Sequence, residues 1–381
     1  MFLLLAVLFP LLLTLNHLPA SSAQEVSTPA SWVTLQLSDQ RQVWIDSGQP
    51  LALSPDGRWL AGWRNGDGGP EVCAFLTETL TEESCASFPG ESIASASVAW
   101  SPDGMSFAFT DEDMFVEPDL WVLDVEAGTV TNLTDDGQDD KFSAPPGTPT
   151  DLAPAWSPDG TEIVFARSVR EGESEKDEVE STTLQVISAN GGEPREVLQV
   201  AEDQFAVRTG VRWLSDGTVL YSLTVDSGGP ENGLWTVDVA GGDPRQIVSA
   251  AETGSEETVL VAVSSRGQAM LRAGGNFPSF SLIDLETGQL VPLKHSEPAT
   301  IRVVSATFSP DGRQVLFVAG SSGSSQLIVR DLATNAEQNL GELQWPLGSN
   351  EMIGGLTWAA NDLAFGPGPA NSGVLLRLES E

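Results

Sequence analysis

The stretch VAWSPDGMSFAF, residues 98–109, joins two short apolar segments through the tetrapeptide Ser-Pro-Asp-Gly. Proline presets the backbone φ angle for the second position of a type I turn, and aspartate and glycine suit the two positions that follow. The same tetrapeptide recurs at 54–57, 157–160 and 309–312. Each copy therefore predicts a tight reversal from one strand, which we call a, into a second strand, b.

Three degenerate copies complete the series. VRWLSDGTVLYSL (211–223) keeps the Asp-Gly pair, VAVSSRGQAMLRA (261–273) keeps only Gly267, and GLTWAANDLAFG (355–366) has Asn361 and Asp362 instead. The chain thus holds seven copies at a spacing of about fifty residues. The intact turn residues are Asp56, Gly57, Asp103, Gly104, Asp159, Gly160, Asp216, Gly217, Asp311 and Gly312.

A second motif follows each turn at a variable distance. LWVLDVEAGTVTNLT (120–134) matches LWTVDVAGGDPRQIV (234–248), FSLIDLETGQLVPL (280–293) and LIVRDLATNAEQNL (327–340). Each copy alternates apolar and polar residues, turns after an aspartate at a glycine, and continues as a further strand. Asn335 replaces the glycine in the last copy, and asparagine tolerates the left-handed backbone that such a turn needs. Each repeat therefore predicts four strands, a to d, and no segment shows a convincing helical period.

Seven four-stranded antiparallel units predict an all-β fold, a seven-bladed β-propeller over residues 32–381. The last unit ends after its third strand, so we expect an N-terminal strand, RQVWI (41–45), to join it and close the ring. WVTLQL (32–37) is expected to pair beside that strand. An open ring is the alternative.

The run AWSPDG (99–104), the alternating strand after it and the second motif resemble the PD40, or TolB-like, repeat of exported bacterial propellers. The resemblance extends over nearly the whole of 32–381 and implies a WD40-like propeller outside the cytoplasm. In that group the motif marks blades and not a function. TolB has a separate domain before its propeller, whereas here we expect only a short leader, 24–31, before the first strand.

The N-terminal segment is predicted to be a targeting signal. Residues 2–15 are almost all Leu, Val, Ala and Phe, and small residues follow at 21–23. This pattern predicts a signal peptide over 1–23, with an uncleaved anchor as the alternative. No later stretch is apolar enough to span a membrane, so we expect the mature chain to be periplasmic, attached to the cell surface or secreted.

Cys73 and Cys85 are the only cysteines. In an oxidising compartment a disulfide is the default state of such a pair. The segment EVCAFLTETLTEESCASF (71–88) has the pattern of strand, turn and strand with one cysteine on each arm. We therefore predict a cross-strand disulfide, with two buried thiols as the alternative.

The chain carries 54 acidic and 18 basic residues, a formal net charge of −36. Such a surface repels nucleic acid and anionic lipid and attracts cations and basic partners. We expect a monomer with no nucleic-acid ligand. Solubility alone is a sufficient explanation of the charge.

Ligands of a propeller are expected over the central funnel, on the face formed by the d–a and b–c loops. Positions five or six residues before the end of strand a would line its entrance, and they are Asp151, Arg208, Glu257 and Arg302. Trp345, on a long d–a loop, suits a sugar or a protein contact. The alternatives are ion pairs within the ring for the charged residues and simple packing for the tryptophan.

Few residues suit metal or acid–base chemistry. His17 falls in the signal, so His295 is the one histidine of the mature chain, and it cannot build a usual zinc site alone. Acidic loops near Asp111 and Asp113, and near Asp139 and Asp140, offer oxygen ligands for Ca²⁺ without EF-hand spacing. No other cofactor is expected.

These observations favour an exported, non-enzymatic propeller that binds a protein of the cell envelope or its surroundings, or a peptide or glycan. One alternative is a carbohydrate-active or other hydrolase that uses acidic funnel residues. A second is a binding module stabilised by Ca²⁺.

Overall fold

The computed structural model describes residues 34–43, 45, 48–88, 92–93, 98–112, 118–135, 137, 147–171, 179–201, 210–225, 229–274, 279–294, 302–321, 324–343, 356–367 and 372–380. All of them lie in the unit Thr34–Glu381. The predicted signal peptide, 1–23, and leader, 24–31, lie outside the described residues.

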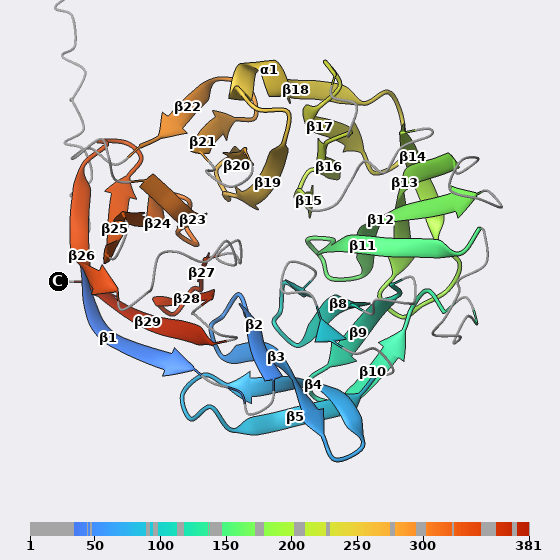
Figure 1. The fold of residues 1–381 in the computed structure, drawn as a ribbon, viewed down its shortest axis with the longest axis horizontal. Helices are drawn as coiled ribbons and strands as arrows, with labels where there is room; N and C mark the ends of the chain where they lie inside the picture. Colours follow the sequence, from blue (N-terminus) through green and yellow to red (C-terminus); the bar gives the residue numbers. More distant parts are fainter. Residues whose placement is uncertain are drawn as a thin grey trace, which may run out of the picture. The chain divides into compact units, whose positions relative to one another are not determined.

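Seven antiparallel sheets stand in a ring, each with one strand toward the centre (Figure 1). Blade 1 contains β2 (Gly48–Leu53), β3 (Trp59–Gly66), β4 (Gly69–Leu76) and β5 (Glu82–Ser87). Blade 2 contains β6 (Ser92–Ile93), β7 (Ala99–Trp100), β8 (Ser106–Glu112), β9 (Leu120–Asp124) and β10 (Thr129–Asn132). Its inner strand is split, because β6 and β7 both pair with β8.

The remaining blades follow in chain order. Blade 3 contains β11 (Pro149–Trp156), β12 (Glu162–Glu171), β13 (Val179–Ser188) and β14 (Arg195–Ala201). Blade 4 contains β15 (Val211–Trp213), β16 (Thr218–Leu223), β17 (Gly233–Asp238) and β18 (Arg245–Ser249). Blade 5 contains β19 (Thr258–Val263), β20 (Gln268–Ala273), β21 (Ser279–Asp284) and β22 (Leu290–Leu293). Blade 6 contains β23 (Arg302–Phe308), β24 (Gln314–Ser321), β25 (Ser324–Asp331) and β26 (Glu337–Leu343).

Blade 7 joins the two ends of the chain and confirms the predicted closure of the ring. It contains β27 (Thr357–Trp358), β28 (Leu363–Pro367), β29 (Gly373–Ser380) and, outermost, β1 (Leu35–Val43). β1 runs antiparallel to β29 from the pair Leu35–Ser380 to the pair Val43–Gly373. The fold is thus the predicted seven-bladed propeller of four-stranded antiparallel blades.

The bounds predicted for the closing strand were wrong. Segments 32–37 and 41–45 were expected to form two neighbouring strands, but residues of both belong to the single strand β1. The register shifts by one residue between Leu37 and Asp39, so an irregularity at Ser38 absorbs the extra residue. Such a bulge keeps the strand paired while it bends, which explains why the alternation breaks in the middle of one strand.

The strand β1 is also attached to both neighbouring blades. The side-chain amide of Gln338, in blade 6, accepts from Leu35 N–H at 2.9 Å and donates to Leu35 C=O at 2.7 Å. The Arg41 guanidinium donates to the backbone carbonyls of Thr77 and, at 2.9 Å, Glu78 in blade 1. The closing strand therefore links three consecutive blades.

The Ser-Pro-Asp-Gly turn has the predicted geometry, and its serine has a role that the sequence did not reveal. Gly104 N–H donates to Ser101 C=O at 3.0 Å, and Gly104 has a left-handed φ of 70°. The Ser101 hydroxyl, which is buried, donates to the Asp103 carboxylate at 2.6 Å and accepts from Ser106 N–H at 3.0 Å. The same bonds form around Ser54, Ser157 and Ser309.

These bonds lower the pKa of Asp103. The Ser101 hydroxyl donates to the carboxylate, and Met105 N–H donates to it at 3.0 Å, so both favour its charged form. The stabilisation by this charge is present above the ordinary pKa of aspartate. It is lost as the pH falls through the lowered pKa of the folded protein.

The degenerate turns keep the backbone conformation but close one residue sooner. Ser101 N–H bonds to the carbonyl five residues later, whereas Leu214 N–H bonds to Thr218 C=O, four residues later, at 2.8 Å. The left-handed position is retained in all seven turns, even by Asp362 with a φ of 60°. The repeat therefore conserves the shape of the reversal when its letters change.

One helix lies among the described residues, although none was predicted. It is the single turn α1 (Ala250–Thr253), where Glu252 accepts from Ser249 N–H at 2.9 Å and from the Ser249 hydroxyl at 2.7 Å. A helix long and apolar enough to cross a membrane does not occur in the described part of the chain.

We expect Ser101→Ala to lower the free energy of unfolding by about 1–2 kcal/mol, because it leaves the partly buried N–H of Ser106 without this acceptor. Urea denaturation measures the change. Ser215→Ala is the matched control, since Ser215 is an exposed serine in the turn of blade 4, and its effect should be below about 0.5 kcal/mol. Equal effects of the two variants would contradict the role given to Ser101.

Candidate functional site

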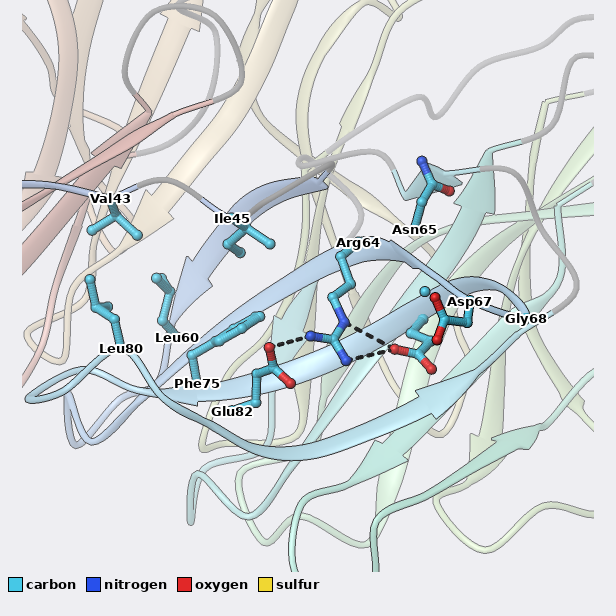
Figure 2. A pocket seen from close by; sticks show the side chains of 12 residues that line it. Val43, Ile45, Leu60, Arg64, Asn65, Asp67, Gly68, Phe75, Leu80 and Glu82 are labelled. Carbon is cyan, nitrogen blue, oxygen red and sulfur yellow. Dashed lines mark hydrogen bonds and ion pairs between the residues drawn. The ribbon is translucent and has the colours of Figure 1, made fainter.

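A pocket of about 460 Å³ lies where β1 leads into blade 1, at the junction that closes the ring (Figure 2). Two of its residues, Val43 and Ile45, belong to β1 and the connection that follows it. The others belong to β3, β4, β5 and the turns between them, and they are Leu60, Arg64, Asn65, Gly66, Asp67, Gly68, Glu71, Phe75, Leu80 and Glu82. The pocket is therefore complete only when the ring is closed.

The two ends of the pocket differ in chemistry. Val43, Ile45, Leu60, Phe75 and Leu80 gather at one end, and all but Leu80 are buried (Figure 2). The other end carries the charged side chains and the hairpin between β3 and β4. A ligand with an apolar part and a polar head fits this division.

Arg64 holds two carboxylates in place at the polar end. Its guanidinium donates to Oε2 of Glu71 at 3.0 and 2.9 Å through two nitrogens, and to Oε1 of Glu82 through the third (Figure 2). Burial of Arg64 disfavours its charge, but the hydrogen bonds and charges of Glu71 and Glu82 outweigh this effect and raise its pKa. The three side chains thus form a fixed group before any ligand arrives.

The register of the sheets explains why Arg64 turns outward. Arg64 and Arg167 occupy the same position, seven residues after the turn glycine of their blades. In blade 3 the inner-strand residue opposite Arg167 is Asp151, whereas in blade 1 the residue opposite Arg64 is Gly48. Directly paired residues on neighbouring strands are in reach of each other. Arg64 has no carboxylate opposite it on the inner strand, and it pairs instead with Glu71, which stands opposite it on β4, and with Glu82 on β5.

The predicted disulfide is confirmed. Cys73 on β4 and Cys85 on β5 are paired in the register and joined by a disulfide bond. The sulfur atoms lie within 4.8 Å of a carboxylate oxygen of Glu71. Among the described residues, these three side chains are the one group spaced for a metal ion, but the bond between the sulfurs occupies both of them.

Of the predicted funnel residues, Asp151 and Glu257 lie in ion pairs within their own blades. Arg167 donates to both carboxylate oxygens of Asp151, at 2.7 Å each, and the Asp151 side chain is only 1% exposed. Arg272 pairs with Glu257 at 3.2 Å. The sequence reading missed both arginines, although each follows a turn glycine on strand b, where a charge interrupts an apolar run.

Most of the other predicted site residues lie outside the part of the chain that the structure describes. Arg302 is exposed at the start of β23. Arg208, Trp345, His295, Asp113, Asp139 and Asp140 lie outside the described residues, as does the side chain of Asp111. Ligand binding by the funnel residues and by the acidic loops therefore stays a prediction.

Arg212 is a charged residue of the inner ring that the sequence reading did not single out. The other six blades have Ala or Thr at its position, namely Ala52, Ala99, Ala155, Ala262, Thr307 and Thr357. The Arg212 guanidinium donates to Val211 C=O at 2.7 Å and, across to blade 5, to Val261 C=O at 2.9 Å. Burial lowers its pKa. We interpret Arg212 as a link between blades 4 and 5.

Comparisons with known proteins support the fold and do not define a family. No protein-family model matches the chain, and no curated protein matches it. The chain is similar to the solved structure "Oligogalacturonate lyase in complex with manganese", with 12% identity, a TM-score of 0.61, and coverage of 91% of this chain and 98% of that one. It is also similar to the Cps50 (Swd1) β-propeller domain of Myceliophteria thermophila, with 12% identity, a TM-score of 0.57, and coverage of 90% and 99%.

TolB from Acinetobacter baumannii has a lower structural similarity, with a TM-score of 0.45, 16% identity, and coverage of 79% of this chain and 65% of that one. This similarity is too low to bear on the family. The fold class is therefore β-propeller, and the resemblance to the PD40 repeat stays a prediction.

We expect Asp151→Asn to lower the free energy of unfolding by about 3 kcal/mol, because it leaves a largely buried arginine without its carboxylate. The double variant Asp151→Asn with Arg167→Gln should recover more than half of the loss. Urea denaturation of the three proteins measures both effects. A single variant as stable as the parent would contradict the structural role of this ion pair.

Proposed function

We propose that this chain is an exported, non-enzymatic β-propeller that binds another protein of the cell envelope or its surroundings. The observation that carries the proposal is the pocket at the ring junction, where Arg64 already fixes the carboxylates of Glu71 and Glu82. A preformed site loses little conformational entropy on binding. The disulfide between Cys73 and Cys85 fits an oxidising compartment outside the cytoplasm.

The polar end of the pocket lies on the expected binding face of the ring, whereas its apolar end extends toward the β4–β5 turn at Leu80. The pocket includes the b–c hairpin of blade 1 at Asp67 and Gly68, and the d–a connection at Ile45. The a–b turns lie at the opposite ends of the strands, where some of them bond to the turn of a neighbouring blade. Ala360 N–H donates to Pro55 C=O at 2.9 Å, for example. We place the partner on the hairpin face and the structural contacts on the turn face, with the protein acting as a monomer.

A second candidate is a carbohydrate-active enzyme, favoured by the likeness to oligogalacturonate lyase over 91% of the chain. A glycosidase needs two carboxylates that flank the scissile bond. Asp151 is buried and bonded to Arg167 through both oxygens, so it is poorly placed to be one of them. Enzymatic turnover of any substrate in a panel of glycosides and uronides would favour this candidate over the binding function.

We expect immobilised mature protein to enrich a basic partner from envelope fractions of its source. Two variants with equal change of charge locate the contact: Asp67→Lys on the hairpin face and Glu78→Lys on the β4–β5 turn, both exposed positions. The first should reduce recovery of the partner at least tenfold, because it places like charge against a basic surface, and the second should leave it unchanged. Failure to enrich any partner above background would contradict the proposal.

A further inference from the structure

We infer that the pocket at the ring junction takes an aliphatic ammonium group, the side chain of a lysine presented by the partner protein. This inference rests on the proposed function and adds the chemistry of the contact. It follows from the charge of the polar end, the free oxygen atoms there, and the apolar end that adjoins them.

The polar end carries more negative than positive charge. Three carboxylates, those of Asp67, Glu71 and Glu82, face one guanidinium, that of Arg64. Arg64 fixes two of the carboxylates but neutralises only one of the three charges. An anionic ligand is therefore repelled, and a cation is attracted from a distance by a chain of net charge −36.

The carboxylate oxygens that Arg64 leaves unused at the polar end are hydrogen-bond acceptors, and the Asn65 amide beside them offers a further acceptor oxygen as well as a donor. Arg64 uses Oε2 of Glu71 and Oε1 of Glu82. Within the described part of the chain, no hydrogen-bond donor reaches the second oxygen of either glutamate or the carboxylate of Asp67. A primary ammonium has three N–H donors and no acceptor, so it matches this set.

The apolar end distinguishes an ammonium on a carbon chain from a metal ion. The apolar wall provides no side-chain oxygen ligand for a metal ion (Figure 2). It consists of Leu60 and Phe75 on blade 1 and of Val43 and Ile45, which belong to the closing strand and the connection after it. A lysine places four methylene groups behind its charge, and these fit against such a wall. Ca²⁺ takes six to eight oxygen ligands, and the fixed guanidinium of Arg64 beside the three carboxylates opposes a second, divalent charge.

Two positions of blade 1 near the pocket carry no side chain. Gly62 stands opposite Cys73 in the register, and Gly48 stands opposite Arg64. Because residues alternate between the faces of a strand, Leu60, Gly62 and Arg64 share one face of β3. Between the apolar Leu60 and the charged Arg64, this face of β3 therefore carries no side chain.

The test uses the mature protein and two probes of equal length, Nα-acetyl-lysine amide and the uncharged Nα-acetyl-norleucine amide, with binding measured by calorimetry. We expect the lysine probe to bind at least tenfold more tightly. Glu82→Gln should weaken it about tenfold, since hydrogen bonds to a charged group are among the strong ones. The Glu82 side chain is 46% exposed, so this variant should fold, and Asp67→Asn serves as a second variant on the exposed hairpin.

Glu83→Gln is the matched control, because Glu83 is the exposed neighbour of Glu82 and does not line the pocket. It should change the affinity less than twofold. The inference is overturned if the norleucine probe binds as tightly as the lysine probe, if Glu83→Gln weakens binding as much as Glu82→Gln, or if millimolar Ca²⁺ displaces the lysine probe.

The two proposals fail in different ways. If the parent protein captures a partner and Glu82→Gln captures it equally well, the lysine contact is wrong and the binding function stands. If no partner is captured but the lysine probe binds with the expected pattern, the pocket assignment stands and the protein-binding function is wrong.

Discussion

The pairing of β1 with β29 is the interaction on which the rest of the structure depends. A ring of seven sheets removes its exposed edges only when the last sheet is complete, and here the outermost strand of blade 7 comes from the other end of the chain. Gln338 ties β1 to blade 6, and Arg41 ties it to blade 1. Val43 of the same strand lines the pocket. The pocket is therefore complete only when β1 has closed the ring. Any ligand of the pocket stabilises the closed ring by mass action.

The blades are built alike but joined by different contacts. Around blades 7, 1 and 2 the a–b turns touch, and Trp100 donates from blade 2 to Ala52 C=O in blade 1 at 3.1 Å. A Cβ added at Gly217 or Gly267 would meet no atom within 4 Å, so there is more space beside the glycines of these two turns. The turn of blade 5 still contacts that of blade 6, where Arg266 donates to Asp311 C=O at 2.9 Å. Arg212 bonds blade 4 to blade 5.

Much of the fold was predictable because the repeat encodes local geometry. The seven turns, the four strands per blade, the cross-strand disulfide and the closing strand all follow from turn chemistry and period-two alternation. The bounds of β1 were not predictable, because the irregularity at Ser38 interrupts the alternation. The pocket was not predicted because, in the sequence, Arg64 looks like any charged residue on a strand. Only the register of the sheet shows that Gly48, which has no side chain, stands opposite it on the inner strand. The partners of Asp151 and Glu257 depend on which strands pair, which a residue count along one strand does not show.

Hydrogen exchange of the backbone amides, followed by mass spectrometry, tests the central claim most directly, namely that β1 closes the ring and completes the pocket. Peptides that cover Leu35–Val43 and Gly373–Ser380 report on the two strands of the closure. The account predicts that the amides of β1 that donate to β29 exchange as slowly as their partners in β29, because the strands open together, whereas the outward-facing amides of this edge strand exchange fast. Exchange of every β1 amide within seconds, while β29 stays protected, would contradict it.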